Sequence, residues 1–124
     1  MTKMNMVWVA VAKLLHSHSA QSVTKSDIDR LVEKFFQAKI TPVMINVHLV
    51  ASEDRQADKA NPQRGGSRNR YLSREINGTF RLYKKSDEAR DGFDKTGPTH
   101  PSVNLLPDEY KHLVDWYKNE YFPS

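Results

Sequence analysis

Apolar positions recur with a helical period in the first part of the chain. Trp8, Val11 and Leu15 lie three and four residues apart, and a second apolar row runs beside them. An apolar stripe this wide is typical of a helix that is buried on much of its surface. The pattern therefore predicts a first helix over about residues 5–16.

The second helical pattern is the most regular in the chain. Its apolar residues follow the spacing i, i+3, i+4 and i+7: Ile28, Leu31, Val32 and Phe35. Thr24 precedes the pattern as a candidate N-cap, and Asp27 at the third helical position places a carboxylate near the helix N-terminus. We expect an amphipathic helix that ends at about Phe36.

A third helix is predicted over about residues 42–51. Thr41 is a candidate N-cap, and Pro42 suits the first helical position because its missing N–H has no helical partner there. Ile45 and Leu49 fall on the inward face. The opposite face carries valines and an asparagine rather than charges, which favours contact with a partner molecule.

Residues 68–85 have the pattern of a β-hairpin. Asn77-Gly78 lies between two alternating runs, which predicts a type I′ turn with a positive φ at both positions. We expect an apolar side with Leu72, Ile76, Phe80 and Leu82. We expect a basic side with Arg74, Arg81 and Lys84. A basic side suits an anionic partner, although ordinary edge hairpins also use Lys and Arg against aggregation.

The segments around the hairpin differ in character. Residues 52–67 have no periodicity and contain Asn-Pro and Gly-Gly breakers, which predicts a long loop. Residues 86–104 are polar and predict a connector. A C-terminal helix is expected to begin at Pro107, with an apolar and aromatic stripe at helical spacing: Tyr110, Leu113, Val114, Tyr117 and Tyr121. The stripe either packs on the domain or forms a dimer contact.

Length and composition favour one folded domain with an added helix. The chain of 124 residues is 38% hydrophobic and has no cysteine, which excludes disulfides and thiolate chemistry. It has no apolar run long enough for a transmembrane helix. We expect a cytoplasmic protein, nucleoid-associated if its source is bacterial or archaeal. The predicted organisation is a domain over residues 1–85, a connector over 86–104 and a helix over 105–124.

The net charge of +4 conceals a charge gradient along the chain. Residues 55–85 contain nine Lys or Arg against two Asp or Glu, a local charge of +7. Residues 86–124 contain four basic and eight acidic residues, a local charge of −4. A basic block that is confined to one segment points to a localised anionic partner.

Three helices followed by a basic hairpin form the element order of a winged helix-turn-helix. Residues 6–85 resemble the winged helix-turn-helix modules of the HARE-HTH group, which occur beside restriction-type nucleases and in chromatin-associated proteins. The resemblance is carried by VWVAVAKLL, VTKSDIDRLVEKF, TPVMINVHL and RYLSREINGTFRLY, the last of which is similar to the G-x-[YF]-x-L ending of such modules. It implies an α+β winged helix-turn-helix, from which the loop 52–67 and the C-terminal helix depart.

The resemblance implies binding to double-stranded DNA as a regulator or sensor. Helix 42–51 would read the major groove, with Asn46 on adenine and Val43 and Val47 on thymine methyl groups, beside Thr41. Loop and hairpin cations would contact phosphates: Arg64, Arg68, Arg70, Arg74, Arg81 and Lys84. Each residue also has an ordinary surface role, and we expect about half of the cations to contact phosphate.

A protein-interaction module is the alternative function, because a fold does not determine a function. This module would use helix 42–51 and the tyrosine-rich C-terminal helix as its binding surfaces. A homodimer through the C-terminal helix is compatible with either function.

Catalysis and metal binding have no support in the sequence. No nucleophile motif or phosphate-loop motif is present. His16 and His18 lack a third ligand nearby, and the acidic cluster from Asp87 to Asp94 lies in the polar connector, where we expect it to be solvated. We predict a protein that is not an enzyme, with no metal, cofactor or membrane partner.

Overall fold

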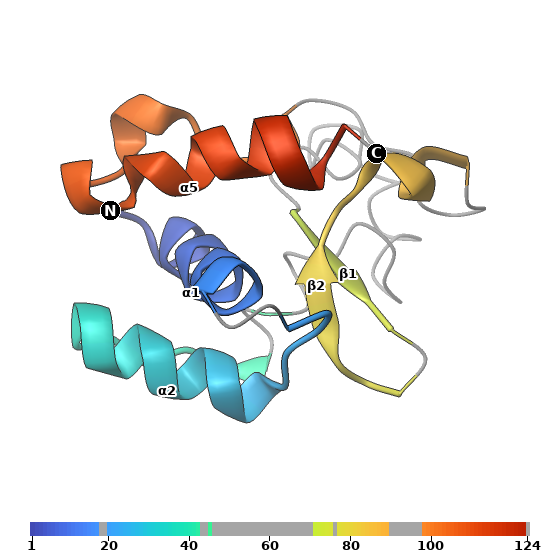
Figure 1. Ribbon diagram of the computed structural model, residues 1–124. Coiled ribbons are helices and arrows are strands. Elements are labelled where there is room, and N and C mark those ends of the chain that lie inside the picture. Colours follow the sequence, from blue (N-terminus) through green and yellow to red (C-terminus); the bar gives the residue numbers. More distant parts are fainter. Residues whose placement is uncertain (18–19, 43–44, 46–70, 76, 90–97, 124) are drawn as a thin grey trace, which may run out of the picture.

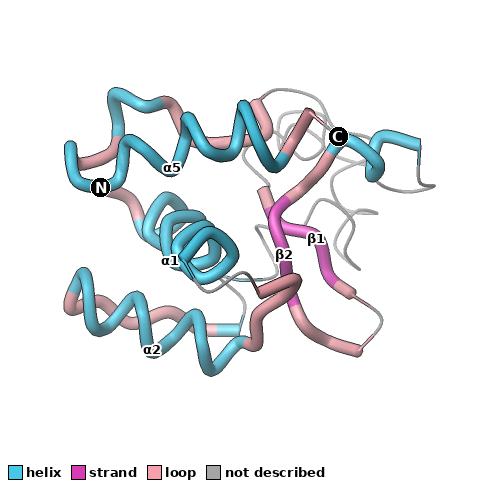
Figure 2. The backbone as a smooth tube through the Cα atoms, in the orientation of Figure 1, coloured by secondary structure: helices cyan, strands magenta, loops and turns pink. Residues whose placement is uncertain are grey.

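The computed structural model describes residues 1–17, 20–42, 45, 71–75, 77–89 and 98–123 (Figure 1). These residues have an α+β architecture. Helix α1 (Lys3–Ser17) lies between α2 (Lys25–Phe36) and α5 (Lys111–Trp116). A two-stranded antiparallel hairpin, β1 (Leu72–Arg74) and β2 (Phe80–Leu82), stands beside these helices (Figure 2).

Helix α1 is the central element because it is apolar on nearly every side. Its residues from Val7 to Ala12 are all fully buried. Among the elements that pack on it are α2, β2 and α5. The wide apolar stripe is therefore confirmed, although the helix extends slightly further at both ends than predicted.

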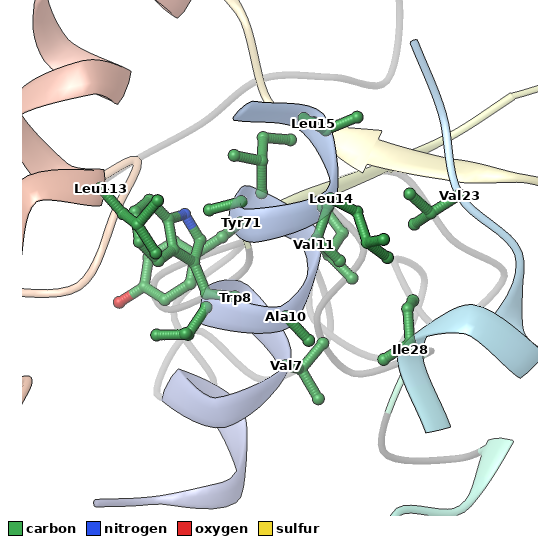
Figure 3. Close-up of a cluster of buried hydrophobic side chains, with 14 of the residues drawn as sticks. Val7, Trp8, Ala10, Val11, Leu14, Leu15, Val23, Ile28, Tyr71 and Leu113 are labelled. Carbon is green, nitrogen blue, oxygen red and sulfur yellow. The ribbon is translucent and has the colours of Figure 1, made fainter. Parts of the chain in front are cut away.

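The core joins distant parts of the chain around α1. Figure 3 shows Trp8 beside Leu113 on one side of α1, with Val23 and Ile28 on the other. The rings of Trp8 and Tyr117 meet edge to face, with centroids 5.9 Å apart and planes at 74°. Such aromatic pairs add to the free energy of burial. The first helix and the last helical segment thus share one core.

Helix α2 begins as its sequence predicts. The Thr24 hydroxyl accepts the Asp27 N–H at 3.1 Å, and the Asp27 carboxylate accepts the Thr24 N–H at 3.1 Å, which completes a capping box. The bond from the Thr24 backbone lowers the pKa of Asp27. The helix ends at Phe36, and Gln37 follows in the left-handed conformation with a φ of 51°.

The hairpin turn differs from the predicted type I′ turn. Gly78 has a φ of 85°, but the hydrogen bonds around it are not those of a two-residue turn. The Glu75 N–H donates to the Thr79 carbonyl at 2.8 Å, and the Gly78 N–H donates to the Glu75 carbonyl at 2.9 Å. These bonds close a three-residue loop with glycine at the bulge position. The Asn77 side chain supports the loop by accepting the Thr79 N–H and hydroxyl. Ile76, which we expected on the apolar side, lies outside the described residues.

The extra loop residue sets the strand register. The pairs are Leu72 with Leu82, Ser73 with Arg81, and Arg74 with Phe80. A two-residue turn at 77–78 would instead place Arg74 opposite Arg81. Because side chains alternate with a period of two, Arg74 and Arg81 lie on opposite faces of the hairpin. The prediction of one basic side with both arginines is therefore wrong.

The segment between α1 and α2 is attached to the hairpin. Val23 and Phe80 exchange two backbone hydrogen bonds, with lengths of 2.8 and 2.7 Å. Val23 thus occupies a single strand position beside β2. This bridge ties the start of α2 to the hairpin.

The C-terminal helix is not one regular helix. Two 3-10 turns, Val103–Leu105 and Asp108–Tyr110, precede α5, and a π-helical turn, Tyr117–Tyr121, follows it. In the π turn the Phe122 N–H donates to the Tyr117 carbonyl at 2.8 Å. The predicted stripe packs on the domain, since its first four members are buried: Tyr110, Leu113, Val114 and Tyr117.

The third predicted helix is described only at its start. Pro42 and Ile45 are helical, and the Ile45 N–H donates to the Thr41 carbonyl at 3.4 Å. Ile45 is buried, as predicted. The remainder of helix 42–51 and the loop 52–67 lie outside the described residues. Among the helices that are described, none has the length and apolar character needed to cross a membrane.

Candidate nucleic-acid interface

Four of the ten predicted DNA-binding residues belong to the described part of the chain: Thr41, Arg74, Arg81 and Lys84. The other six lie outside the described residues: Val43, Asn46, Val47, Arg64, Arg68 and Arg70. The described candidates thus lie at the start of helix 42–51 and at the hairpin.

Thr41 and Arg74 are exposed. Thr41 precedes the first turn of the third helix, where its carbonyl accepts the Ile45 N–H. Arg74 is the last residue of β1 and forms no ion pair with the described residues. Both side chains are accessible to a large ligand such as a nucleic acid.

Lys84 lies just after β2 and is half-buried. Its backbone N–H donates to the Asp87 carboxylate at 3.0 Å. Its ammonium group forms no ion pair with the part of the chain that the structure describes. Lys84 therefore retains a charge that an anion can contact.

Arg81 does not occupy the exposed position expected of a phosphate ligand. Only 5% of its side chain is exposed, and its guanidinium donates two bonds of 2.7 Å to the carboxylate of Asp87. It also pairs with Glu75 and donates to the Leu82 carbonyl at 3.0 Å. Its assignment as a phosphate contact is corrected: the positive charge is neutralised inside the protein.

The pKa of Arg81 reflects two opposing effects. Burial lowers the pKa, because it disfavours the charged form. The hydrogen bonds and negative charge of Asp87, followed by those of Glu75, raise the pKa well above its ordinary value. Arg81 therefore remains a cation that is fully occupied by internal partners.

Asp87 is the residue that sequence reasoning missed. We expected it in a solvated acidic connector, but it lies in a 3-10 turn, Lys85–Ala89, with none of its surface exposed. Its carboxylate also accepts the Ser73 hydroxyl at 3.1 Å. Glu88, its neighbour, is exposed as predicted. Asp91 and Asp94 lie outside the described residues. A serine-to-aspartate contact across fourteen positions leaves no local sequence pattern.

Two tyrosines of the last helical segment reach the end of β2. The Tyr117 hydroxyl donates to the Tyr83 carbonyl, and the Tyr121 hydroxyl donates to the Leu82 carbonyl at 3.0 Å. Burial raises the pKa of Tyr117 above its ordinary value and raises the pKa of Tyr121 to about 12. The hydroxyls therefore stay protonated as donors over the whole physiological range.

A polar depression lies beside the hairpin. Its volume is about 490 Å³, and it is lined by Gln21, Ser22, Glu75, Asn77, Arg81 and Lys84. Lys84 supplies the one lining cation that has no internal anionic partner among the described residues. The depression combines the α1–α2 segment with the hairpin, so it adds polar groups to the predicted interface.

Metal-binding groups are sparse in the described part of the chain. The His16 and His112 rings lie 6.0 Å apart, from α1 and α5 respectively. No group of three or more His, Asp or Glu side chains suited to a metal ion occurs among the described residues. Two imidazoles alone fall short of the four-coordinate set of a structural zinc site.

The described elements are compatible with a winged-helix layout. Two helices, the start of a third helix and an antiparallel hairpin follow one another in that order. The single strand position at Val23 lies beside the hairpin. In comparisons with known proteins, no family model, no curated protein and no solved structure matches this chain.

Proposed function

We propose that this protein binds double-stranded DNA, as a regulator or sensor, through helix 42–51 and the basic segment 55–85. The observation that carries the proposal is the concentration of nine Lys or Arg against two acidic residues in the segment that leads into and forms the hairpin. Such a segment attracts phosphates and releases condensed counterions. The element order of a winged helix-turn-helix supports the same function.

The proposed interface divides into two sets of residues. Base edges face the third helix: Thr41, Val43, Asn46 and Val47. Phosphates face the loop and hairpin cations: Arg64, Arg68, Arg70, Arg74 and Lys84. Phosphate contacts give affinity and orientation, whereas base contacts give sequence preference. Arg81 is left out of the second set, because Asp87 and Glu75 neutralise it.

Fluorescence anisotropy of a labelled DNA duplex across a salt series tests the proposal. With about five phosphate contacts, we expect the affinity to fall about five hundredfold between 50 and 200 mM salt. An Arg74→Ala/Lys84→Ala variant should bind more weakly and have a shallower salt dependence, by about 0.9 in slope for each phosphate that is no longer neutralised. Lys3→Ala/Lys34→Ala removes the same charge from exposed positions of α1 and α2 and is the matched control.

Two results would contradict parts of the proposal. Equal weakening in both double variants would show that only net charge matters and would contradict a hairpin contact. No binding of the unaltered chain at low salt would contradict DNA binding altogether. The alternative of a protein-binding module would then rest on helix 42–51, because four residues of the C-terminal stripe are buried in the domain.

A further inference from the structure

The hairpin is too short to determine its own orientation. Its strands are Leu72–Arg74 and Phe80–Leu82, three residues each. An isolated two-stranded hairpin is marginally stable at best in water. Its position must therefore be set by the elements that surround it. Helix α1 contacts β2, and Val23 pairs with Phe80.

Asp87 holds the face of the hairpin that carries Ser73 and Arg81. One carboxylate accepts hydrogen bonds from Arg81 at 2.7 Å, from the Ser73 hydroxyl at 3.1 Å and from the Lys84 N–H at 3.0 Å. Ser73 belongs to β1 and Arg81 to β2, so Asp87 bridges both strands. Charge-assisted bonds of this kind are shorter and stronger than neutral ones.

The last helical segment adds two further attachments. Tyr117 and Tyr121 donate their hydroxyls to consecutive carbonyls at the end of β2, those of Tyr83 and Leu82. Tyr117 is fully buried against Trp8 of α1, so its hydroxyl is fixed by the core. The hairpin is thereby connected to the core by side chains from far along the chain.

We infer that Asp87, Tyr117 and Tyr121 form a hairpin latch, a set of positioning residues that fixes the hairpin and with it the cations Arg74 and Lys84. The consequence for DNA rests on the proposed function. A cation on a fixed hairpin loses less conformational freedom on binding than a cation on a mobile one. The latch thus contributes to affinity without touching DNA.

Amide hydrogen exchange measured by NMR tests the latch without DNA. In Tyr121→Phe we expect the hairpin amides of Phe80 and Tyr83 to exchange about fivefold faster, as the removal of one hydrogen bond implies. The amide of Val32 in α2 should keep its rate. Tyr110→Phe is the matched control, because Tyr110 is buried and its hydroxyl forms no hydrogen bond with the described residues.

The exchange experiment has two outcomes that would overturn the latch. Unchanged rates at Phe80 and Tyr83 would show that the hydroxyl does not hold the hairpin. An equal acceleration at Val32 would show a general loss of stability rather than a local release. Faster exchange at Phe80 and Tyr83 in Tyr110→Phe would likewise show a general loss of stability rather than a local release.

DNA titrations test the consequence for binding. We expect Tyr121→Phe and Tyr117→Phe to raise the dissociation constant about fivefold and to leave the salt slope unchanged. Arg74→Ala should lower the slope, because it removes a cation that neutralises a phosphate. A lowered slope in the tyrosine variants, or an unchanged dissociation constant, would overturn the positioning role. If the unaltered chain binds no duplex, the proposed function fails, and the exchange rates alone decide on the latch.

Discussion

The guanidinium of Arg81 lies between two carboxylates with 5% of its side chain exposed. Exposed ion pairs contribute about 0–1 kcal/mol, because water screens the charges on both partners. Burial removes this screening, so the loss of one partner leaves a desolvated charge inside the protein. Asp87 is the fully buried partner, and the stability of this region therefore depends on its negative charge.

Asp87→Asn should destabilise the protein by about 3–5 kcal/mol, because it leaves Arg81 buried without its main anion. Glu88→Gln is the matched control: Glu88 pairs with Lys85 on the surface, with 48% of its side chain exposed. The control should cost less than about 0.5 kcal/mol. Urea denaturation measures both values. If Asp87→Asn lowered the free energy of unfolding as little as the control does, Asp87 would not stabilise the buried cation.

At the scale of elements, the C-terminal helical segment is part of the core rather than an addition to it. Leu113 is fully buried, and Tyr117 meets Trp8 of α1 edge to face. The same segment donates hydrogen bonds to the end of β2. One element thus contacts both the central helix and the hairpin, which is why the stripe is aromatic and also carries hydroxyls.

Leu113→Ala should destabilise the protein by about 2–5 kcal/mol, since it removes buried methyl groups and leaves a cavity against α1. Leu105→Ala makes the same chemical change at a residue with 61% of its surface exposed, and it should cost less than about 0.5 kcal/mol. Thermal and urea denaturation measure the loss of stability in both variants. A similar loss in free energy of unfolding for the two substitutions would show that α5 does not belong to the core.

At the scale of the whole molecule, the two charged regions of the chain are in contact. The acidic C-terminal region supplies Asp87, which pairs with Arg81 of the basic block. Part of the charge gradient along the sequence therefore reflects complementarity within the fold. The remaining cations of residues 55–85 are the ones that favour binding of an external anion.

Alkaline pH should unfold the protein through its tyrosines. Burial raises the pKa of Tyr121 from 10.0 to about 12, and it also raises the pKa values of Tyr71, Tyr110 and Tyr117. The neutral form is favoured in the fold, so this stabilisation is complete below pH 10 and is lost as the pH rises from 10 towards 12. Ultraviolet absorbance of tyrosinate should rise together with the loss of helical circular dichroism. Tyrosinate that appears near pH 10 with the helices intact would contradict the burial of these hydroxyls.

Local patterns of the sequence determined several elements. Helical spacing and the Thr24–Asp27 capping box specify α2 through contacts within a few residues. The wide apolar stripe specifies α1 as a buried helix. The tyrosine stripe predicts a C-terminal helical segment but leaves open whether it packs on the domain or on a second copy. The start of helix 42–51 at Pro42 was also predictable, because Thr-Pro has a local effect on the backbone.

Only the tertiary structure decided which hairpin cations are exposed and which are paired inside the protein. A loop of three residues instead of two moved Arg81 to the face opposite Arg74, and that face is covered by Asp87. The two loops differ in which residues close them by hydrogen bonds, and an Asn-Gly pair alone does not determine this. The partners of Arg81 and of the two tyrosine hydroxyls come from other elements. Contacts between residues so far apart in the sequence arise from the packing of the elements, and the spacing of residues along the chain does not predict them.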